Sequence, residues 1–258
     1  MLDERIAYIE DLSLNAWPSH KMELYDGWIL RFSYFYTHRT NYVEQIGACT
    51  LPWNIKIPYC EREYARLGSP ALFKISPLVD PNLDYLLENR GYEVQHETLV
   101  MTMDLSGTYY PPQPLVALSE DIPLEWIHGL FTLKQMESKI HWKVVPSMYA
   151  AIPKDTICAR IYEGEEIVAT GLGILDRDYI GIYAIHVRDD CRRRGYARSI
   201  CESLLRSGKK KGATSAYLQV VKGNESAKRL YSSLGFEELY SYYFRVQNAP
   251  AAPFTRPA

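Results

Sequence analysis

The residues best suited to chemistry lie in the short segment "CRRRGYARSI", residues 191–200. Three arginines precede a glycine, and a helical pattern begins directly after that glycine. The N–H groups in the first turn of a helix have no partners within the helix, and the helix dipole adds partial positive charge there. A glycine lets an anion approach the backbone because it has no side chain. The layout of the segment therefore suits the binding of a small anion at the start of the helix.

The whole chain carries no excess of positive charge. It has 258 residues, with 29 Lys and Arg against 31 Asp and Glu, and a formal net charge of −2. A protein that binds a nucleic-acid backbone or an anionic membrane by charge usually has a broad basic surface. We therefore expect no nucleic-acid partner and no membrane partner. Two explanations of the arginines remain open, a solvated charged surface and a confined anion site.

The cysteines and the apolar residues narrow the class of protein. The five cysteines show neither the paired spacing of a zinc site nor that of a disulfide framework, so we expect free thiols, a reducing compartment and no bound metal. No apolar run reaches the roughly 18 residues that a membrane span needs. The N-terminal residues are acidic, unlike a secretory signal. These features predict a cytoplasmic protein.

The arginine segment lies in the second half of the chain, where the sequence predicts alternating strands and helices. A strand ends just before the arginines, and from residue 195 apolar side chains recur at helical spacing. The expected elements are helices at 122–137 and 146–151, a hairpin at 156–176, a strand at 178–187, a helix from 195, a strand at 214–221, a helix from 224 and a strand at 238–246. This order predicts the α/β class, with a mixed central β-sheet flanked by helices.

The first half repeats part of this order. It predicts helices at 57–68 and 81–91 and strands at 70–76 and 96–105. The pair Gly91–Tyr92 ends one of these helices as Gly235–Phe236 ends the last helix of the second half. We take this match to suggest an internal duplication.

Two motifs in the second half resemble a known family. The first is R-x-x-G-x-A, formed by Arg192, Gly195 and Ala197, and the second is "NESAKRLYSSLGF", residues 224–236. Together they are similar to the GCN5-related N-acetyltransferase (GNAT) superfamily, whose pyrophosphate-binding signature is [QR]-x-x-G-x-[GA]. The resemblance covers about residues 119–246. It implies the GNAT fold, acetyl-CoA as cosubstrate and no metal.

The resemblance also implies roles for single residues. The Val187 N–H would donate to the thioester oxygen, and Tyr231 would protonate the departing thiolate as the catalytic acid. Tyr231 could instead only pack within the apolar stripe of its helix, and Asn224 could cap its helix as well as contact the cofactor. The implied cofactor-binding residues are Ile185, His186, Val187, Arg192, Arg193, Arg194, Gly195, Tyr196, Ala197, Arg198 and Asn224.

No general base follows from the sequence. Alternation along the strand places Tyr183 and Ile185 on the face of Val187 and His186 on the other face, where a structural role is expected. A base could act through water from Tyr183 or from the segment with Glu137 and His141, or the amine could deprotonate in solution. The expected acceptor-side residues are Tyr183, Glu137, Trp28, Arg31 and Tyr36, with Arg39 beside them.

These expectations define domains and a function. Residues 1–110 form a degenerate GNAT-like domain without the phosphate motif, 111–118 a linker, 119–246 the catalytic domain and 247–258 a flexible tail. The layout resembles tandem GNAT proteins, which include enzymes that modify small metabolites or detoxify amine-bearing antibiotics. We expect acetyl transfer to a primary amine of a small molecule. Acetylation of a protein N-terminus or lysine and a non-catalytic CoA sensor are the alternatives.

Overall fold

The computed structural model describes residues 2–247 and divides them into two compact units. Unit 1 holds residues 2–7, 19–99 and 240–247, and unit 2 holds residues 8–18 and 100–239. Apart from its first residue, the predicted tail at 247–258 lies outside the described residues.

This division differs from the boundary expected at the proline-rich segment. Two long strands, β5 (Tyr92–Asp104) and β11 (Glu237–Gln247), each contribute residues to both units. The last part of β11 belongs to unit 1 because it pairs with β4 (Leu72–Ile75), with Tyr243 opposite Ile75. The expected linker at 111–118 runs into strand β6 (Ala117–Ser119) of unit 2. Pairing between distant strands, rather than chain composition, sets the units.

Unit 1 is a sheet with two helices of its own. Its strand order is β1-β2-β3-β4-β11-β5, with β1 (Lys21–Tyr25), β2 (Trp28–Phe32) and β3 (Val43–Gln45) as an antiparallel series. The helices α2 (Trp53–Arg66) and α3 (Pro81–Asn89) confirm the two that were predicted. A single 3-10 turn covers His38–Thr40. The hydrophobic core of unit 1 includes Trp28, Tyr64 and Phe73.

Unit 2 contains the arginine segment. Its strand order from β5 is β5-β10-β9-β8-β7-β6, with β7 (Asp155–Glu163), β8 (Glu166–Asp176), β9 (Tyr179–Val187) and β10 (Ser215–Val221). Neighbours from β6 to β9 are antiparallel, whereas β9 and β10 are parallel. The helices are α4 (Leu124–Leu133), α5 (Lys139–Ala150), α6 (Tyr196–Lys210) and α7 (Glu225–Leu234), together with most of α1 (Leu2–Ala16). The predicted mixed α/β class is confirmed.

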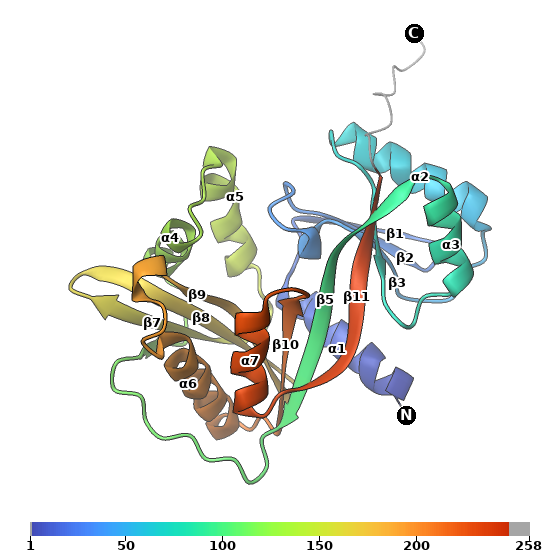
Figure 1. The fold of residues 1–258 in the computed structure, drawn as a ribbon. Helices are drawn as coiled ribbons and strands as arrows, with labels where there is room; N and C mark the ends of the chain where they lie inside the picture. Colours follow the sequence, from blue (N-terminus) through green and yellow to red (C-terminus); the bar gives the residue numbers. More distant parts are fainter. Residues whose placement is uncertain (1, 248–258) are drawn as a thin grey trace. The chain divides into compact units, whose positions relative to one another are not determined.

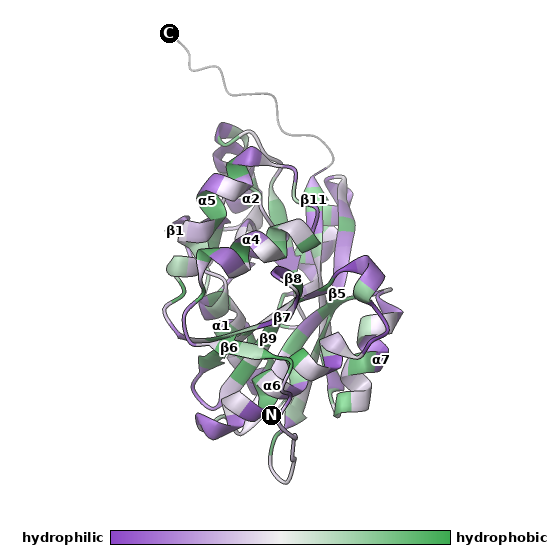
Figure 2. Cartoon of the chain, turned by 90° about the vertical axis from the view of Figure 1, so that its left-hand side faces the viewer, coloured by the Kyte–Doolittle hydropathy of each residue, from purple (hydrophilic) through white to green (hydrophobic). Residues whose placement is uncertain are grey.

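The helices of unit 2 cover both faces of its sheet. Figure 1 draws α4 and α5 on one side of β7–β9 and α6 on the other. The apolar stripe predicted for α6 is buried, including Ile200, Cys201, Leu204 and Leu205. Figure 2 shows that α7 carries both hydrophobic and hydrophilic turns, as expected of a helix with one face against a sheet. Within residues 2–247 no helix is long and apolar enough to cross a membrane.

The helix α5 is longer than predicted. It begins after Ser138, whose hydroxyl accepts a hydrogen bond from the His141 N–H at 3.3 Å, and it continues past Pro146. A proline inside a helical pattern usually marks a boundary, because it removes one backbone donor and restricts the preceding turn. The sequence therefore indicated only the part from residue 146 onward. Buried residues lie on both sides of the proline: Val145 before it, and Met148 and Tyr149 after it. Packing of this face holds the helix together through Pro146.

Glycines in β8 allow α6 to approach the sheet closely. A Cβ added at Gly171 would lie 2.3 Å from Ile200 Cγ2 and 2.8 Å from Ile185 Cδ1. At Gly173, on the same strand face, the nearest atom would be Ile180 Cδ1 at 2.9 Å. The start of α6 therefore has a fixed position on β8, and its first turn lies beside the end of β9.

We predict that Gly171→Ala lowers the free energy of unfolding by about 1–3 kcal/mol because the added methyl overpacks the contact with α6. Gly173→Ala is the matched control on the same strand face. Its cost should be smaller, because the end of a flexible side chain can move away from the new methyl. Urea denaturation of the two variants measures the difference, and equal midpoints would show that this contact does not position α6.

Candidate functional site

The arginine segment forms an irregular turn at the start of α6. The 3-10 turn Asp189–Cys191 follows β9, and α6 begins at Tyr196. Arg193 and Gly195 both adopt left-handed conformations, with φ of 66° and 82°. Glycine does so without cost, whereas a left-handed arginine is strained. The chain thereby turns into the helix with its backbone exposed.

This turn presents a run of free backbone donors. The first helical hydrogen bond is that of the Ser199 N–H to the Gly195 carbonyl at 3.0 Å. Over the described chain, none of the N–H groups from Arg193 to Arg198 donates a hydrogen bond. Six successive free donors at a helix start are suited to bind an anion, and the helix dipole adds partial positive charge there. The predicted residues 193–198 are thus gathered at one point.

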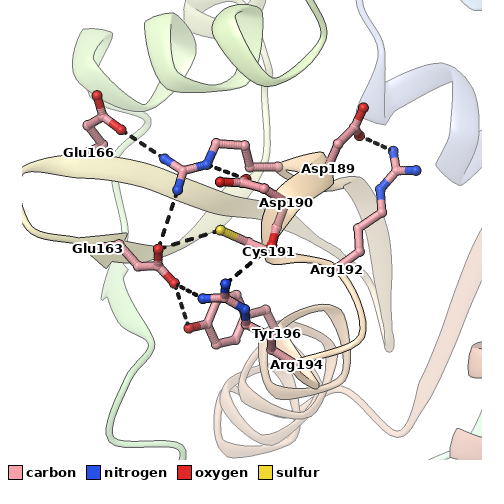
Figure 3. A network of polar contacts seen from close by, with 9 residues as sticks. Glu163, Glu166, Asp189, Asp190, Cys191, Arg192, Arg194 and Tyr196 are labelled. Carbon is pink, nitrogen blue, oxygen red and sulfur yellow. Dashed lines mark hydrogen bonds and ion pairs between the residues drawn. The ribbon is translucent and has the colours of Figure 1, made fainter.

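The arginine side chains are mostly engaged with carboxylates (Figure 3). Arg192 Nη2 lies 2.6 Å from an Asp189 oxygen, and Arg194 Nη1 lies 2.6 Å from Glu163 Oε1. Among the residues that the structure describes, the Arg193 guanidinium pairs with none. The positive charge that the sequence suggested for an anion is therefore largely neutralised locally, and the backbone donors remain available.

The other side chains of the turn also hold its shape. The Tyr196 hydroxyl donates to Glu163 Oε1 at 3.0 Å. Arg198 donates to the Ser233 hydroxyl of α7 at 2.5 Å and lies 3.5 Å from Glu202. These contacts tie the first turn of α6 to the β7–β8 hairpin and to α7.

Glu163 is a site residue that sequence reasoning did not find. It ends β7 before a two-residue turn in which Gly164 has φ of 62°, and besides Arg194 and Tyr196 it binds Arg188 at 3.3 Å. The turn "EGEE" was visible in the sequence. Its pairing with residues some 30 positions later was not, because it depends on how the hairpin packs beside the end of β9.

The strand β9 separates from β10 before it reaches the turn. The two strands pair only between Tyr179–Ile182 and Ser215–Leu218, whereas β9 continues to Val187. On its other side, the Arg188 N–H donates to the Val168 carbonyl of β8 at 2.9 Å. Because N–H groups alternate sides along a strand, the Val187 N–H points away from β8, to the side where pairing with β10 has ended. It therefore faces the opening between β9 and β10.

A β-bulge changes which side chains of β9 share a face. Ala184 has φ of 51°, and the register with β8 shifts between His186, opposite Thr170, and Tyr183, opposite Leu172. The prediction from simple alternation is wrong here, because the extra residue reverses the faces beyond it. Tyr183 and His186 lie on one face, whereas Ile185 points to the α6 side, against Gly171.

His186 stays neutral near pH 7. Burial lowers its pKa from the ordinary 6.5 to about 4, and the nearby charges of Lys134 and Arg192 act in the same direction. A general base works best when its pKa lies near the operating pH. This imidazole is therefore a weak proton acceptor near pH 7.

The residues expected on α7 lie at its start and on its buried face. The Asn224 side chain caps the helix, because its Oδ1 accepts a hydrogen bond from the Ala227 N–H at 3.2 Å. Tyr231 is 8% exposed, and its ring centroid lies 6.2 Å from that of Phe236. The packing and capping roles that the sequence left open are thus both present.

The expected acceptor-side residues are divided between the two units. Tyr183 is buried in unit 2, where its hydroxyl lies 2.5 Å from that of Tyr217, and Glu137 is exposed in the loop between α4 and α5. In unit 1, Trp28 is in the core.

Arg31, which was also expected on the acceptor side, lies in the interior of unit 1. Arg31 is 1% exposed and donates to the Arg39 carbonyl and the Tyr42 hydroxyl, each at 2.9 Å. Tyr36 is half-buried in the loop after β2.

Comparison with known proteins identifies the family. A family described as "Probable histone acetyltransferase Rv0428c C-terminal" matches residues 4–244. The chain is 26% identical over 246 residues to the uncharacterized N-acetyltransferase YobR of Bacillus subtilis, covering 94% of this chain and 98% of that protein.

Two solved structures share the fold. A GCN5-related N-acetyltransferase from Kribbella flavida superposes with a TM-score of 0.68 at 15% identity, over 95% of each chain. A tandem GNAT protein from the clavulanic acid biosynthesis pathway superposes with a TM-score of 0.56 at 13% identity, over 81% of this chain and 76% of its own.

The family match and the fold identify an acetyltransferase of the GCN5-related class, an acetyl-CoA-dependent class of enzymes. Within it, the chain belongs to the family of the Rv0428c C-terminal region, whose model spans nearly the whole described chain.

We predict that His186 makes the protein less stable in acid. The unfolded chain gains a proton near pH 6.5, whereas the native chain resists it until about pH 4, so stability falls as the pH drops through this window. His186→Gln removes this loss. The melting temperature of the variant should therefore fall less than that of the wild type between pH 7 and pH 4.5. The pKa of His38 is also about 4, but His38 is present in both proteins, so its effect cancels when their melting temperatures are compared. An equal fall in the melting temperature of the two proteins would show that His186 is readily protonated in the folded protein.

Proposed function

We propose that unit 2 transfers the acetyl group of acetyl-CoA to a primary amine of a small molecule. The observation that carries the proposal is the pairing of two backbone features. Six free N–H groups, from Arg193 to Arg198, lie in the turn and at the start of α6, and the Val187 N–H points to the side where β9 leaves β10. The first feature suits a diphosphate and the second a thioester oxygen.

The residues present fit acetyl-CoA. The N–H groups from Arg193 to Arg198 would hold the pyrophosphate, with the Arg193 side chain beside them. The edge of β9 from Ala184 to Val187, beyond its pairing with β10, would accompany the pantetheine arm. Asn224 lies at the start of α7, shortly after β10, the strand that β9 leaves. When bound, the cosubstrate supplies an activated acetyl group on a thiol that leaves readily.

The chain's own residues then have distinct tasks. The Val187 N–H would donate to the carbonyl oxygen, where negative charge develops as the amine attacks. The Tyr231 hydroxyl would donate a proton to the departing sulfur, and its burial keeps the ring in one orientation. No dedicated base is assigned, because the neutral His186 has a low pKa. The amine would reach the site already deprotonated.

A second candidate is acetylation of a protein lysine. The matching family is described as a probable histone acetyltransferase, and this description favours a protein acceptor. A small acceptor is favoured by the likeness in fold to a tandem GNAT protein from the clavulanic acid biosynthesis pathway. A panel of small amines, polyamines and aminated antibiotics, run beside a histone-tail peptide with detection of released thiol, separates the two.

We also propose that unit 1 is a degenerate copy without chemistry. It keeps the order α2, β4, α3 and β5, in which Asp80 caps α3 as Asn224 caps α7, and Leu87 stands where Tyr231 stands. Because it has no counterpart of the R-x-x-G-x-A motif, it would stabilise unit 2 or contact the acceptor.

We predict that Tyr231→Phe slows thiol release about 100-fold or more, because the leaving thiolate loses its proton donor. Affinity for acetyl-CoA should stay within about twofold of wild type, since the ring and its packing are kept. Stopped-flow thiol detection and titration calorimetry measure the two effects. A chain that binds acetyl-CoA but turns over no amine in the panel would instead be a CoA sensor.

A further inference from the structure

Glu163 collects donors from the whole loop that carries the anion site (Figure 3). Its Oε1 accepts from Arg194 at 2.6 Å and from the Tyr196 hydroxyl at 3.0 Å. Its Oε2 accepts from Arg188 at 3.3 Å and from the Cys191 thiol at 3.6 Å. Arg188 directly follows β9, Cys191 ends the 3-10 turn, and Arg194 and Tyr196 flank Gly195 at the start of α6. One carboxylate on a hairpin turn thus connects both ends of the loop.

The remaining acidic groups complete the charge balance of the loop. Arg188 also lies 2.8 Å from Glu166 and 2.6 Å from Asp190, and Arg192 lies 2.6 Å from Asp189. Burial raises the pKa of the Cys191 thiol, so it donates as a neutral group. Of the four arginines at positions 188, 192, 193 and 194, only Arg193 has no carboxylate partner among residues 2–247.

We propose that Glu163 is a positioning residue for the anion site: it holds the loop of residues 188–196 in the shape that exposes its N–H groups, and it leaves Arg193 as the guanidinium that meets the anion. The inference rests on the proposed function, in which the anion is the diphosphate of acetyl-CoA. Glu163 would act through the loop and would not touch the cosubstrate.

The physical argument concerns conformation rather than attraction. A carboxylate near a diphosphate repels it, so Glu163 does not aid binding by its charge. Arg193, however, holds a left-handed φ of 66°, a strained conformation for a residue other than glycine, which persists only where the surroundings impose it. Bonds from Arg194 and Tyr196 on either side of Gly195 to one carboxylate supply that constraint. The donors are thus in place before an anion arrives, which lowers the entropy cost of binding.

We expect Glu163→Gln to raise the KM for acetyl-CoA about tenfold, with kcat within about twofold of wild type, because the loop loses its preset shape and the chemistry does not change. The variant also frees Arg188 and Arg194 from one carboxylate. Its affinity should therefore fall more steeply with ionic strength than that of the wild type. A general loss of stability would not produce this change in salt dependence.

Two matched comparisons test the assignment. Glu166→Gln removes another partner of Arg188, but its side chain is 79% exposed, and it should leave the KM within about twofold. Arg193→Gln should raise the KM more than Arg192→Gln, because the Arg192 side chain is already paired with Asp189. If Glu163→Gln folds poorly, Tyr196→Phe removes one donor to Glu163 and should raise the KM about threefold.

The outcomes separate this inference from the proposed function. Wild-type protein that gives no heat with acetyl-CoA in calorimetry would refute the proposed function itself. Wild-type binding together with an unchanged or lower KM in Glu163→Gln would overturn only the role of Glu163. Equal effects of Arg192→Gln and Arg193→Gln would refute the role of Arg193.

Discussion

The site depends on hydrogen-bond donors that the fold leaves without acceptors. A helix always has free N–H groups in its first turn, but here the left-handed residues before α6 extend the run back to Arg193. The turn is exposed, so water can satisfy these groups in the free protein. An anion that replaces this water gains several charge-assisted hydrogen bonds at once. The donors point in fixed directions because α6 packs on the glycine face of β8.

The same reasoning explains why a basic cluster need not be a basic surface. Four arginines lie near the turn, yet Glu163, Glu166, Asp189 and Asp190 neutralise most of their charge. Pairs with this degree of exposure contribute little to stability one by one. As a network these ion pairs restrict the shape of the loop. Without them, the like charges of the guanidinium groups would repel one another and push the loop apart. In this loop the charged side chains act mainly by fixing the conformation of the backbone.

The end of β9 combines two departures from regular strand geometry. Its pairing with β10 stops at Ile182, and the bulge at Ala184 follows two residues later. The first leaves the end of β9 without a partner strand on its β10 side. The second sends Ile185 toward α6 and puts His186 on the face of Tyr183. Both departures fall beside the anion site, where strain and irregular geometry are expected at a functional position.

The sequence determined the features that depend on neighbours along the chain. Gly195 before an apolar stripe predicted the start of α6, Asn224 the cap of α7, and the order of strands and helices the mixed α/β class with the resemblance to its superfamily. Only the tertiary structure decided the rest. The unit boundaries depend on pairing between strands that are distant in the sequence, such as β5 and β11. The helix α5 continues through Pro146 because one of its faces is buried. The bulge at Ala184 depends on the register of β9 with β8. The link from Glu163 to Arg194 joins residues 31 positions apart. Contacts of this kind come from packing, which local spacing does not encode.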